Sequence, residues 1–484
     1  MQLYRTLRAN DDRRCIISAM NPTLAGALRV KSPPCIAFIG AGGKTTAMFQ
    51  LARELTAPVI VTATSHLGTW QIELADRHII ANASEPIEEI EHGLNEVILV
   101  TGEPEEERLK PINPELLHWL HGFCGYHSIP LLIEADGSRQ RPLKAWAEHE
   151  PPIPSFVEQV VEVVGVSGVG KPLNMDNVHR PELFSKQSGL NSGKIVTTDA
   201  LTRVLLHEDS GIKNIPSGSR RSILLNQADT PELQSIARTM VKPLLSKFDS
   251  VVVSCLKERQ IFAIHEQVAG ILLAAGESSR FGQPKQLLDW QGESFVHAIA
   301  RTALETGLAP VVIVTGSNAE RVEEAVRDLP VKIVRNEEWK EGQASSIRAG
   351  IFSLTQPPPS LSPHVDLRSD NSPQSFGCWE RVGACIFLLA DQPQITTSIL
   401  RALVEKHAGG LPAILAPMVQ DQRANPVLFD QMTFKDLAGL KGDVGGRAIF
   451  HKHRVEYLPW HDDRLLLDVD TPEMYQRLIS DETL

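Results

Sequence analysis

Two glycine-rich stretches of the chain could hold a phosphate group. The first reads GAGGKTT (40–46), and the second reads GVSGVGKPL (165–173). A phosphate loop needs a strand that ends in a tight glycine turn before a helix, because backbone N–H groups then converge on the phosphates. Its lysine reaches the terminal phosphates, and the hydroxyl of the next residue binds Mg²⁺. Residue types and spacing therefore predict phosphate chemistry at one or both stretches.

The flanking residues favour the first stretch. The apolar run CIAFIG (35–40) predicts a buried strand, and KTTAMFQLAREL (44–55) predicts the helix that must follow. The second stretch fits the longer G-x-x-x-x-G-K spacing, but Pro172 replaces the hydroxyl residue and removes a backbone N–H. We therefore predict ATP or GTP binding at the first stretch. The predicted nucleotide-binding residues are Gly40, Gly42, Gly43, Lys44, Thr45 and Thr46.

Two other segments of the first half carry polar groups directly after an apolar run. LLIEADGSR (131–139) offers Glu134 and Asp136, on opposite sides of an extended backbone, as carboxylate ligands for Mg²⁺ beside Thr45. A solvated turn at the end of a strand is the alternative. LLNQAD (224–229) resembles the N-K-x-D element with which GTPases read guanine, with Gln227 in place of the lysine. A solvent-facing loop accounts for that segment equally well.

A third glycine-rich loop, LAAGESSRFGQPK (273–285), lies in the second half of the chain. Its pattern predicts a strand, a loop and a helix start, with Gly276 allowing close approach of a triphosphate and Arg280 and Lys285 supplying two cations. In FLLADQP a buried strand is predicted to end in Asp391, and LLDVDTPE supplies Asp468 and Asp470 on one face of an extended segment. We predict that Asp391 and Asp470 bind Mg²⁺, although aspartates at strand ends also commonly cap turns.

The chain of 484 residues is too long for one hydrophobic core, so we expect at least two domains. Apolar strand-like runs alternate with helical stretches in both halves, which predicts an α/β fold with parallel sheets covered on both faces. We place an N-terminal extension at 1–27 and two domains at 28–265 and 266–484, with a separate strand on each side of the boundary. The Pro- and Ser-rich segment 355–380 is predicted to be a mobile insertion.

Composition excludes several classes of function. The net charge of −11 argues against broad nucleic-acid binding, and no apolar run is long enough to cross a bilayer. Six scattered cysteines without C-x-x-C, together with an N-terminus lacking a signal-peptide core, predict a cytoplasmic protein. His118, His121, Cys124 and His127 recur every three residues, but we interpret this segment as an ordinary helix end rather than a metal site.

Several motifs of the first half together resemble the selenium-dependent hydroxylase accessory family of the YqeC type. They are GAGGKTT, EADGSRQRPLKA, VVGVSGVGKPL with NVHRPE, and LLNQAD, and they cover about residues 28–253. The resemblance implies a P-loop-like domain and a role in maturing molybdenum hydroxylases, so a client hydroxylase is the implied partner. It also implies that Lys171 and His179 form a loop on the substrate side, with a structured turn as the alternative.

The second half resembles the molybdenum cofactor cytidylyltransferases, within the MobA-like nucleotidyltransferases. The resemblance runs from about 269 to 478 and includes LAAGESSRFGQPK, EGQASSIRAG, LLADQP, RANPVLF, GDVGGR and DVDTPE. It implies a Rossmann-like nucleotidyltransferase fold, with Ala275, Gly276, Arg280 and Lys285 at the triphosphate. Candidates for the pterin or base side are Ser345, Ser346, Asn425 and Asp443. Ala275 favours the cytidylyl branch, because the guanylyl branch commonly has Gly there.

The reaction implied by this resemblance is transfer of CMP from CTP to molybdenum-bound molybdopterin, with release of pyrophosphate. Two anions must meet, so charge neutralisation by Mg²⁺, Arg280 and Lys285, with Asp391 holding the metal, is the expected catalytic contribution. One alternative is a GTP-dependent enzyme or one that uses another acceptor, such as a sugar phosphate. Another is that the first half is a nucleotide-gated cofactor carrier or chaperone without chemistry of its own.

Overall fold

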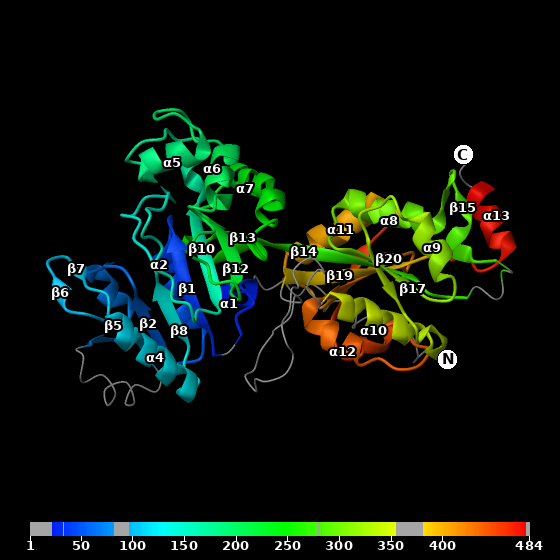
Figure 1. Cartoon of the computed structure of the whole chain (residues 1–484), viewed down its shortest axis with the longest axis horizontal. Helices are drawn as coiled ribbons and strands as arrows, with labels where there is room; N and C mark the ends of the chain where they lie inside the picture. Colours follow the sequence, from blue (N-terminus) through cyan, green and yellow to red (C-terminus); the bar gives the residue numbers. More distant parts are fainter. Residues whose placement is uncertain are drawn as a thin grey trace, which may run out of the picture. The chain divides into compact units, whose positions relative to one another are not determined.

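The computed structural model describes residues 22–31, 33–81, 96–277, 281, 283–354 and 381–480. Two compact units are formed, one by the chain up to Leu244 with Val252–Ile264, the other by Leu245–Val251 with the chain from His265 onward (Figure 1). The predicted insertion at 355–380, and all of the predicted extension before Pro22, lie outside the described residues. The domain limits drawn from the sequence remain a prediction.

The first unit is built on a parallel sheet with the strand order β13-β12-β10-β1-β8-β2-β5-β4. Every strand pair from β12 to β4 for which a register is defined is parallel, as the continuous apolar runs predict. The strands are β1 (Cys35–Gly40), β2 (Val59–Ala63), β4 (Arg77–Ile80), β5 (Val97–Thr101), β8 (Leu131–Glu134), β10 (Gln159–Gly165), β12 (Arg220–Asn226) and β13 (Ser250–Cys255).

Helices cover both faces of this sheet. Alternate residues of β1, among them Ala37 and Ile39, pack with Leu117 and Leu120 of α4, while α2 contacts β1, β2 and β8. The helices are α1 (Leu24–Ala27), α2 (Lys44–Glu54), α4 (Pro114–His127), α5 (Pro181–Ser188), α6 (Thr198–Leu206) and α7 (Pro231–Leu244). The His/Cys segment lies on α4, and no group of three metal-binding side chains converges anywhere in the described ranges.

The second unit contains a mixed sheet with the order β21-β20-β22-β19-β14-β17-β18, and β23 pairs with β20. Its strands are the part of β14 (Gln260–Ala274) from His265 onward, β17 (Val311–Thr315), β18 (Lys332–Arg335), β19 (Val382–Leu389), β20 (Ile414–Val419), β21 (Gln422–Arg423), β22 (Val427–Asp430) and β23 (Val455–Pro459). The parallel prediction fails at β22, which is antiparallel to β19 and β20. The connection from β20 to β22 is too short for the crossover that parallel strands require.

Strand β14 corrects a second expectation. The sequence predicts separate strands before and after Glu266, whereas one strand of 15 residues runs through that position. No glycine or proline interrupts the segment between Gln260 and Ala269, so nothing ends the strand there. A shift of the register with β19 between Gln267 and Val268 marks the place where the apolar run of the second unit begins.

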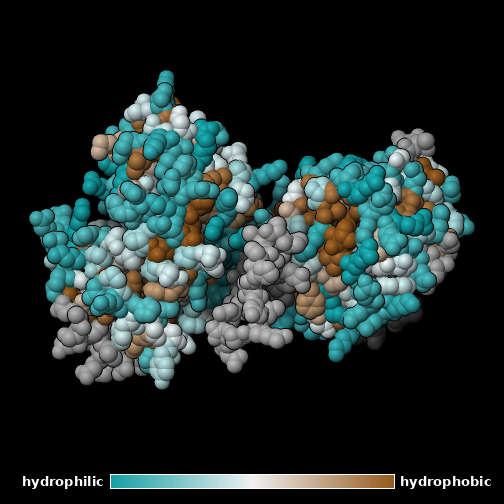
Figure 2. Space-filling model, viewed as in Figure 1, coloured by the Kyte–Doolittle hydropathy of each residue, from teal (hydrophilic) through white to brown (hydrophobic). Residues whose placement is uncertain are grey.

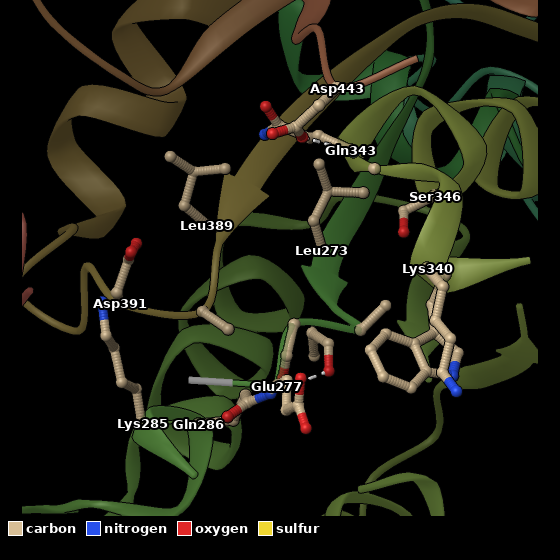
Figure 3. A pocket seen from close by; sticks show the side chains of 16 residues that line it. Leu273, Glu277, Lys285, Gln286, Lys340, Gln343, Ser346, Leu389, Asp391 and Asp443 are labelled. Carbon is tan, nitrogen blue, oxygen red and sulfur yellow. Dashed lines mark hydrogen bonds between the residues drawn. The ribbon is translucent and has the colours of Figure 1, made fainter. Parts of the chain in front are cut away.

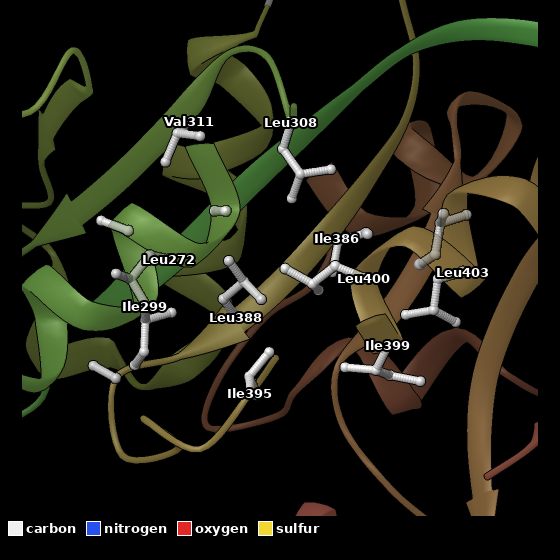
Figure 4. Packing of buried hydrophobic residues seen from close by; sticks show 14 of the residues in the cluster. Leu272, Ile299, Leu308, Val311, Ile386, Leu388, Ile395, Ile399, Leu400 and Leu403 are labelled. Atoms are coloured by element: carbon white, nitrogen blue, oxygen red, sulfur yellow. The ribbon is translucent and has the colours of Figure 1, made fainter. Parts of the chain in front are cut away.

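The core of the second unit lies on both faces of its sheet. Leu272, Ile386 and Leu388 pack against α8 and α11 on one face (Figure 4), and Ile271 and Phe387 pack beneath α10 and α12 on the other. The helices are α8 (Phe295–Thr306), α9 (Ala319–Ala325), α10 (Gln343–Ser353), α11 (Thr397–Ala408), α12 (Phe434–Ala438) and α13 (Pro472–Ser480). The paired strands β14 and β19 are therefore packed against helices on both faces.

Because most hydrophobic side chains are buried in these cores, the exposed surface is expected to be mostly hydrophilic. Figure 2 shows that the visible face of each unit is mostly hydrophilic, with hydrophobic residues exposed in limited areas. Among the described helices, none combines the length and the apolar character needed to span a bilayer.

Candidate functional sites

The carboxyl ends of β14 and β19 open a pocket of about 450 Å³ in the second unit. The two strands are parallel neighbours with Leu273 opposite Leu389, so the loops that follow them leave the sheet at the same edge. The polar and glycine positions of its lining are Gly276, Glu277, Lys285, Gln286, Lys340, Gly342, Gln343, Ser346, Asp391 and Asp443. Figure 3 shows Lys285 and Asp391 on one side of this pocket, with Lys340 and Ser346 on the other.

Lys285 and two acidic segments meet at this pocket. The Lys285 ammonium donates to Asp470 Oδ1 at 2.5 Å, although 185 positions separate the two residues. The Val469 N–H donates to the Asp391 carbonyl at 3.3 Å, which places the segment around Asp468 beside Asp391. The sequence predicts an extended segment at 466–473. In the structure a 3₁₀ turn (Asp463–Leu466) is followed by irregular chain through Asp470. Asp468 and Asp470 are nevertheless exposed on either side of buried Val469.

Asp391 lies in a largely desolvated position beside a second carboxylate, Asp468. Burial, and then the nearby Asp468, raise the pKa of Asp391 to about 6, against the opposing charge of Lys285. Its Oδ1 is buried and has no hydrogen-bond partner among the described atoms. Carboxylate oxygens are the ligands that Mg²⁺ prefers, so Asp391 together with Asp470 fits a magnesium ion that also contacts phosphate.

Glutamine side chains that sequence reasoning missed hold both loops of this site. Gln286 is buried, and its Nε2 donates to the carbonyls of Ala274 (3.1 Å) and Gly276 (2.7 Å). Gln392 donates to Asp468 Oδ1 at 2.6 Å. Each glutamine lies next to a predicted site residue in the sequence, but only the structure shows their partners. The helix start predicted after the loop amounts to one 3₁₀ turn, Lys285–Leu287.

Three of the residues predicted on the substrate side lie at the start of α10: Ser345 and Ser346 belong to the helix, and Asp443 contacts its first residue. Asp443 accepts a hydrogen bond from the Gln343 N–H at 3.1 Å, at the first residue of the helix. The hydroxyl oxygens of Ser345 and Ser346 both accept from Asn336 Nδ2, at 2.8 and 3.0 Å. Ser346 and Asp443 line the pocket, whereas buried Ser345 is engaged with the backbone and Asn336.

A second pocket of about 290 Å³ shares Leu273, Gln343 and Leu389 with the first. Asn425 lies in this neighbouring pocket, together with Arg447 and Asp468, so the predicted substrate-side residues are divided between two adjoining spaces. Arg280, the other predicted cation of the glycine loop, lies outside the described residues.

In the first unit the predicted phosphate loop connects β1 to α2, and its glycines allow close contact with neighbouring chain. Gly40, Gly42 and Gly43 have φ angles of 96°, 82° and 126°. A Cβ at Gly40 would lie 2.2 Å from the carbonyl oxygen of Val163, and one at Gly42 would lie 2.3 Å from the nitrogen of Gly165. The two glycine-rich stretches of the sequence therefore pack against each other, with only the first followed directly by an α-helix.

Lys44, Thr45 and two carboxylates form the polar centre of this loop. Lys44 is buried, and its Nζ lies 2.7 Å from the Gly40 carbonyl and 3.1 Å from Asp136 Oδ1. Thr45 donates to Glu134 Oε2 at 3.2 Å, while Thr46 is exposed on α2. The expectation that Glu134 and Asp136 lie on opposite sides of an extended backbone is wrong, because residues two positions apart share one face of such a chain, and both carboxylates reach Lys44.

Asp136 begins a row of alternating charges that we call the charge ladder: Asp136, Lys144, Glu150 and Arg180. Lys144 Nζ lies 2.8 Å from Asp136 and 3.0 Å from Glu150, which also binds Arg180. Burial raises the pKa of Asp136, but Lys44 and Lys144 bring it below its ordinary value. Since Asp136 also accepts from Trp146 Nε1 at 2.7 Å, Glu134 with Thr45 is the better-placed pair for Mg²⁺.

The α/β fold and the lysine–carboxylate pocket at the ends of β14 and β19 are those expected of a nucleotidyltransferase. Consistent with this, the family model described as the MobA-like NTP transferase domain matches residues 270–457, and the model of the YqeC protein matches residues 36–182. The chain is 31% identical over 226 residues to the uncharacterized protein YqeC of Escherichia coli (strain K12), covering 44% of this chain and 84% of that protein. The chain belongs to the YqeC family, extended by a MobA-like domain.

Two relatives match parts of the chain under other names. Nicotine blue oxidoreductase of Paenarthrobacter nicotinovorans is 29% identical over 221 residues, covering 44% of this chain and 96% of that protein. A probable molybdenum cofactor guanylyltransferase of Bacillus cereus (strain AH187) is 48% identical over 60 residues, covering 12% of this chain and 30% of that protein.

Proposed function

We propose that the second unit transfers CMP from CTP to the phosphate of molybdenum-bound molybdopterin and releases pyrophosphate. The observation that carries this proposal is the Lys285–Asp470 ion pair beside the half-buried Asp391, whose buried Oδ1 has no hydrogen-bond partner among the described atoms, at the carboxyl ends of β14 and β19. The molybdenum cofactor is suggested by the name of the Bacillus relative. CTP rather than GTP is suggested by the resemblance of the loop, with Ala275, to the cytidylyl branch.

The site suits a direct displacement between two anions. An oxygen of the acceptor phosphate forms a bond to the α-phosphorus while the bond from that phosphorus to the bridging oxygen breaks, and pyrophosphate leaves with the electron pair. No general base is needed, because the attacking phosphate is already ionised. Lys285 exchanges Asp470 for the triphosphate, and Arg280 supplies a second cation. Mg²⁺, held by Asp391 and Asp470, would neutralise charge on the triphosphate and the leaving pyrophosphate.

The adjoining pocket supplies room for the acceptor. Ser346 and Asp443 lie at the boundary of α10, and Asn425 lies in the neighbouring space beside Arg447, which can pair with the acceptor phosphate. Ser345 supports this end of the site through Asn336. The division into two adjoining pockets fits a reaction that joins a nucleotide to a second molecule.

For the first unit, the proposal is a nucleotide site that serves the maturation of a client molybdenum hydroxylase. Residues 40–46 would hold the phosphates of ATP or GTP, with Thr45 and Glu134 as the ligands of Mg²⁺. Turnover that depends on Lys44 would mark an enzyme, whereas binding without turnover would mark a nucleotide-gated carrier of cofactor or client.

A redox reaction is a second candidate for the second unit, because the Paenarthrobacter relative is named as an oxidoreductase and matches over most of its length. The lysine and carboxylates at the glycine loop favour phosphate chemistry, since hydride transfer does not require them. Oxidation of NADPH or NADH by the purified chain, with a quinone-type dye as acceptor, distinguishes this candidate.

The deciding experiment is pyrophosphate release by the purified full chain with Mg²⁺ and molybdenum-loaded molybdopterin, comparing CTP, GTP and ATP. We expect release with CTP, reduced at least about a hundredfold in Asp391→Ala and in Lys285→Ala because each removes charge stabilisation at the triphosphate. Lys435→Ala, an exposed lysine on α12, is the matched control and should retain activity. Release with GTP alone would reassign the nucleotide, and no cofactor-dependent release from folded protein would exclude this acceptor.

A further inference from the structure

The N-Q-A-D segment of the first unit (226–229) lies close to the predicted phosphate loop. β1, β10 and β12 are successive parallel strands, so the loop after β1 and the segment after β12 leave the sheet at the same edge. Asn226 is the last residue of β12, and its Nδ2 donates to the Gly42 carbonyl at 2.8 Å. A Cβ at Gly43 would lie 2.4 Å from the same Nδ2. One buried amide therefore fixes this segment against the phosphate loop.

The same amide also fixes the end of β13. Asn226 Oδ1 accepts from the Leu256 N–H at 2.9 Å, and the Ala228 N–H donates to the Ser254 carbonyl at 3.0 Å. The phosphate loop, the end of β12 and the end of β13 are thus joined within one unit. A base attached to a nucleotide in the phosphate loop would be flanked by these two strand ends.

Gln227 and the second glycine-rich stretch shape the turn between Asn226 and Asp229. Gln227 has a φ of 61°, and its side-chain oxygen accepts from the Ser167 hydroxyl. A Cβ at Gly165 would lie 2.4 Å from that oxygen. The second glycine-rich stretch (165–173) therefore packs against the N-Q-A-D turn through Gly165 and Ser167. Asp229 follows this turn and is exposed. Burial, and then a hydrogen bond with Asp229, raise the pKa of the Cys255 thiol.

We propose that Asp229 reads the base of the nucleotide held at Gly40–Thr46, and that this base is guanine. The inference rests on the proposed nucleotide site and names its substrate class. The edge of guanine presents two adjacent donors, the N1–H and the 2-amino group, and a single carboxylate accepts both. Adenine and cytosine present an unprotonated ring nitrogen at the equivalent position, so either base would leave the carboxylate facing an acceptor. Sites that hydrogen-bond a substrate group reject analogues without it by large factors.

Equilibrium binding of a fluorescent GDP analogue to the full chain tests this inference. The second unit is also proposed to bind nucleotides. Binding to the first unit is therefore defined as the part of the fluorescence change that the Lys44→Met substitution removes. We expect unlabelled GDP to displace that component at least about a hundredfold more effectively than ADP or CDP. Equal displacement by ADP or CDP would overturn the guanine assignment and leave the site intact. Absence of a Lys44-dependent component with the fluorescent analogues of GDP, ADP and CDP would overturn the nucleotide site itself.

The variant Asp229→Asn provides a second test at an exposed position, where folding should be unaffected. The amide can accept from an N1–H and donate to a 2-oxo group, so the variant should lose at least about tenfold in GDP affinity and bind xanthosine diphosphate in preference to GDP. Asp209→Asn, an exposed aspartate of the same unit, is the matched control and should keep the affinity for GDP. Unchanged GDP affinity in Asp229→Asn, with no gain for xanthosine diphosphate, would overturn the role of Asp229.

Discussion

The half-buried carboxyl group of Asp391 should make the second unit less stable at neutral pH than an uncharged variant. Folding raises the pKa of Asp391 from its ordinary 3.8 to about 6, chiefly by burial. A group whose pKa is raised on folding stabilises the folded state while protonated. That contribution is complete below about pH 4 and is lost as pH rises through about 6. A shift of about two pKa units corresponds to at most about 3 kcal/mol at pH 8, and relaxation of the site brings the expected value to about 1–3 kcal/mol.

Asp391→Asn should therefore raise the unfolding temperature of the second unit while it abolishes transfer. For a unit of this size, about 1–3 kcal/mol corresponds to roughly 2–12 °C at pH 8, and about half of that free energy should remain at pH 5. Calorimetric unfolding in EDTA at pH 8 and pH 5 measures both values, with the exposed Asp463→Asn as control. A lower unfolding temperature for Asp391→Asn at pH 8, or an equal gain at both pH values, would refute this reasoning.

Three further predictions follow from the geometry of the loops. Gly42→Ala should abolish Lys44-dependent nucleotide binding, because its Cβ meets backbone at 2.3 Å, whereas Gly122→Ala, with nothing within 4 Å, should leave that binding unchanged in the same titration. Gln286→Leu leaves two loop carbonyls without their amide donor, so it should cost about 1–3 kcal/mol in urea unfolding and raise the KM for the triphosphate. Trp146→Phe removes one donor from Asp136 and should cost about 1–2 kcal/mol in the urea unfolding of the first unit.

The sequence predicted the strands well because both sheets are covered on both faces. Runs such as 35–40 and 382–388 are buried throughout, and such continuous apolar runs between turn residues are visible without a structure. The direction of each strand could not be predicted in the same way, because local hydrophobicity indicates burial and contains no information on which strands pair. The antiparallel β22 and the unbroken β14 were missed for that reason, and only chain length between strands or the full register reveals them.

Site residues could be predicted from the sequence where all the interacting residues belong to one contiguous motif. The glycines and Lys44 of the phosphate loop are contiguous, whereas Lys285 and Asp470 are joined only by the fold. Gln286 and Asn226 act on backbone carbonyls, and a backbone carbonyl has no signature in a sequence. Predictions of this kind therefore identify charged groups at a site more readily than the amides that hold its loops in place.

The charge ladder of the first unit has a consequence for natural variation. Lys144 lies between two carboxylates, and Glu150 lies between two cations, so the loss of one member leaves a neighbour buried with an uncompensated charge. Substitution of Asp136, Lys144, Glu150 or Arg180 should thus be tolerated mainly when an adjacent member changes in the same lineage. Related chains should show these four positions covarying in neighbouring pairs, with Asp136–Lys144 the most tightly linked because both side chains are fully buried.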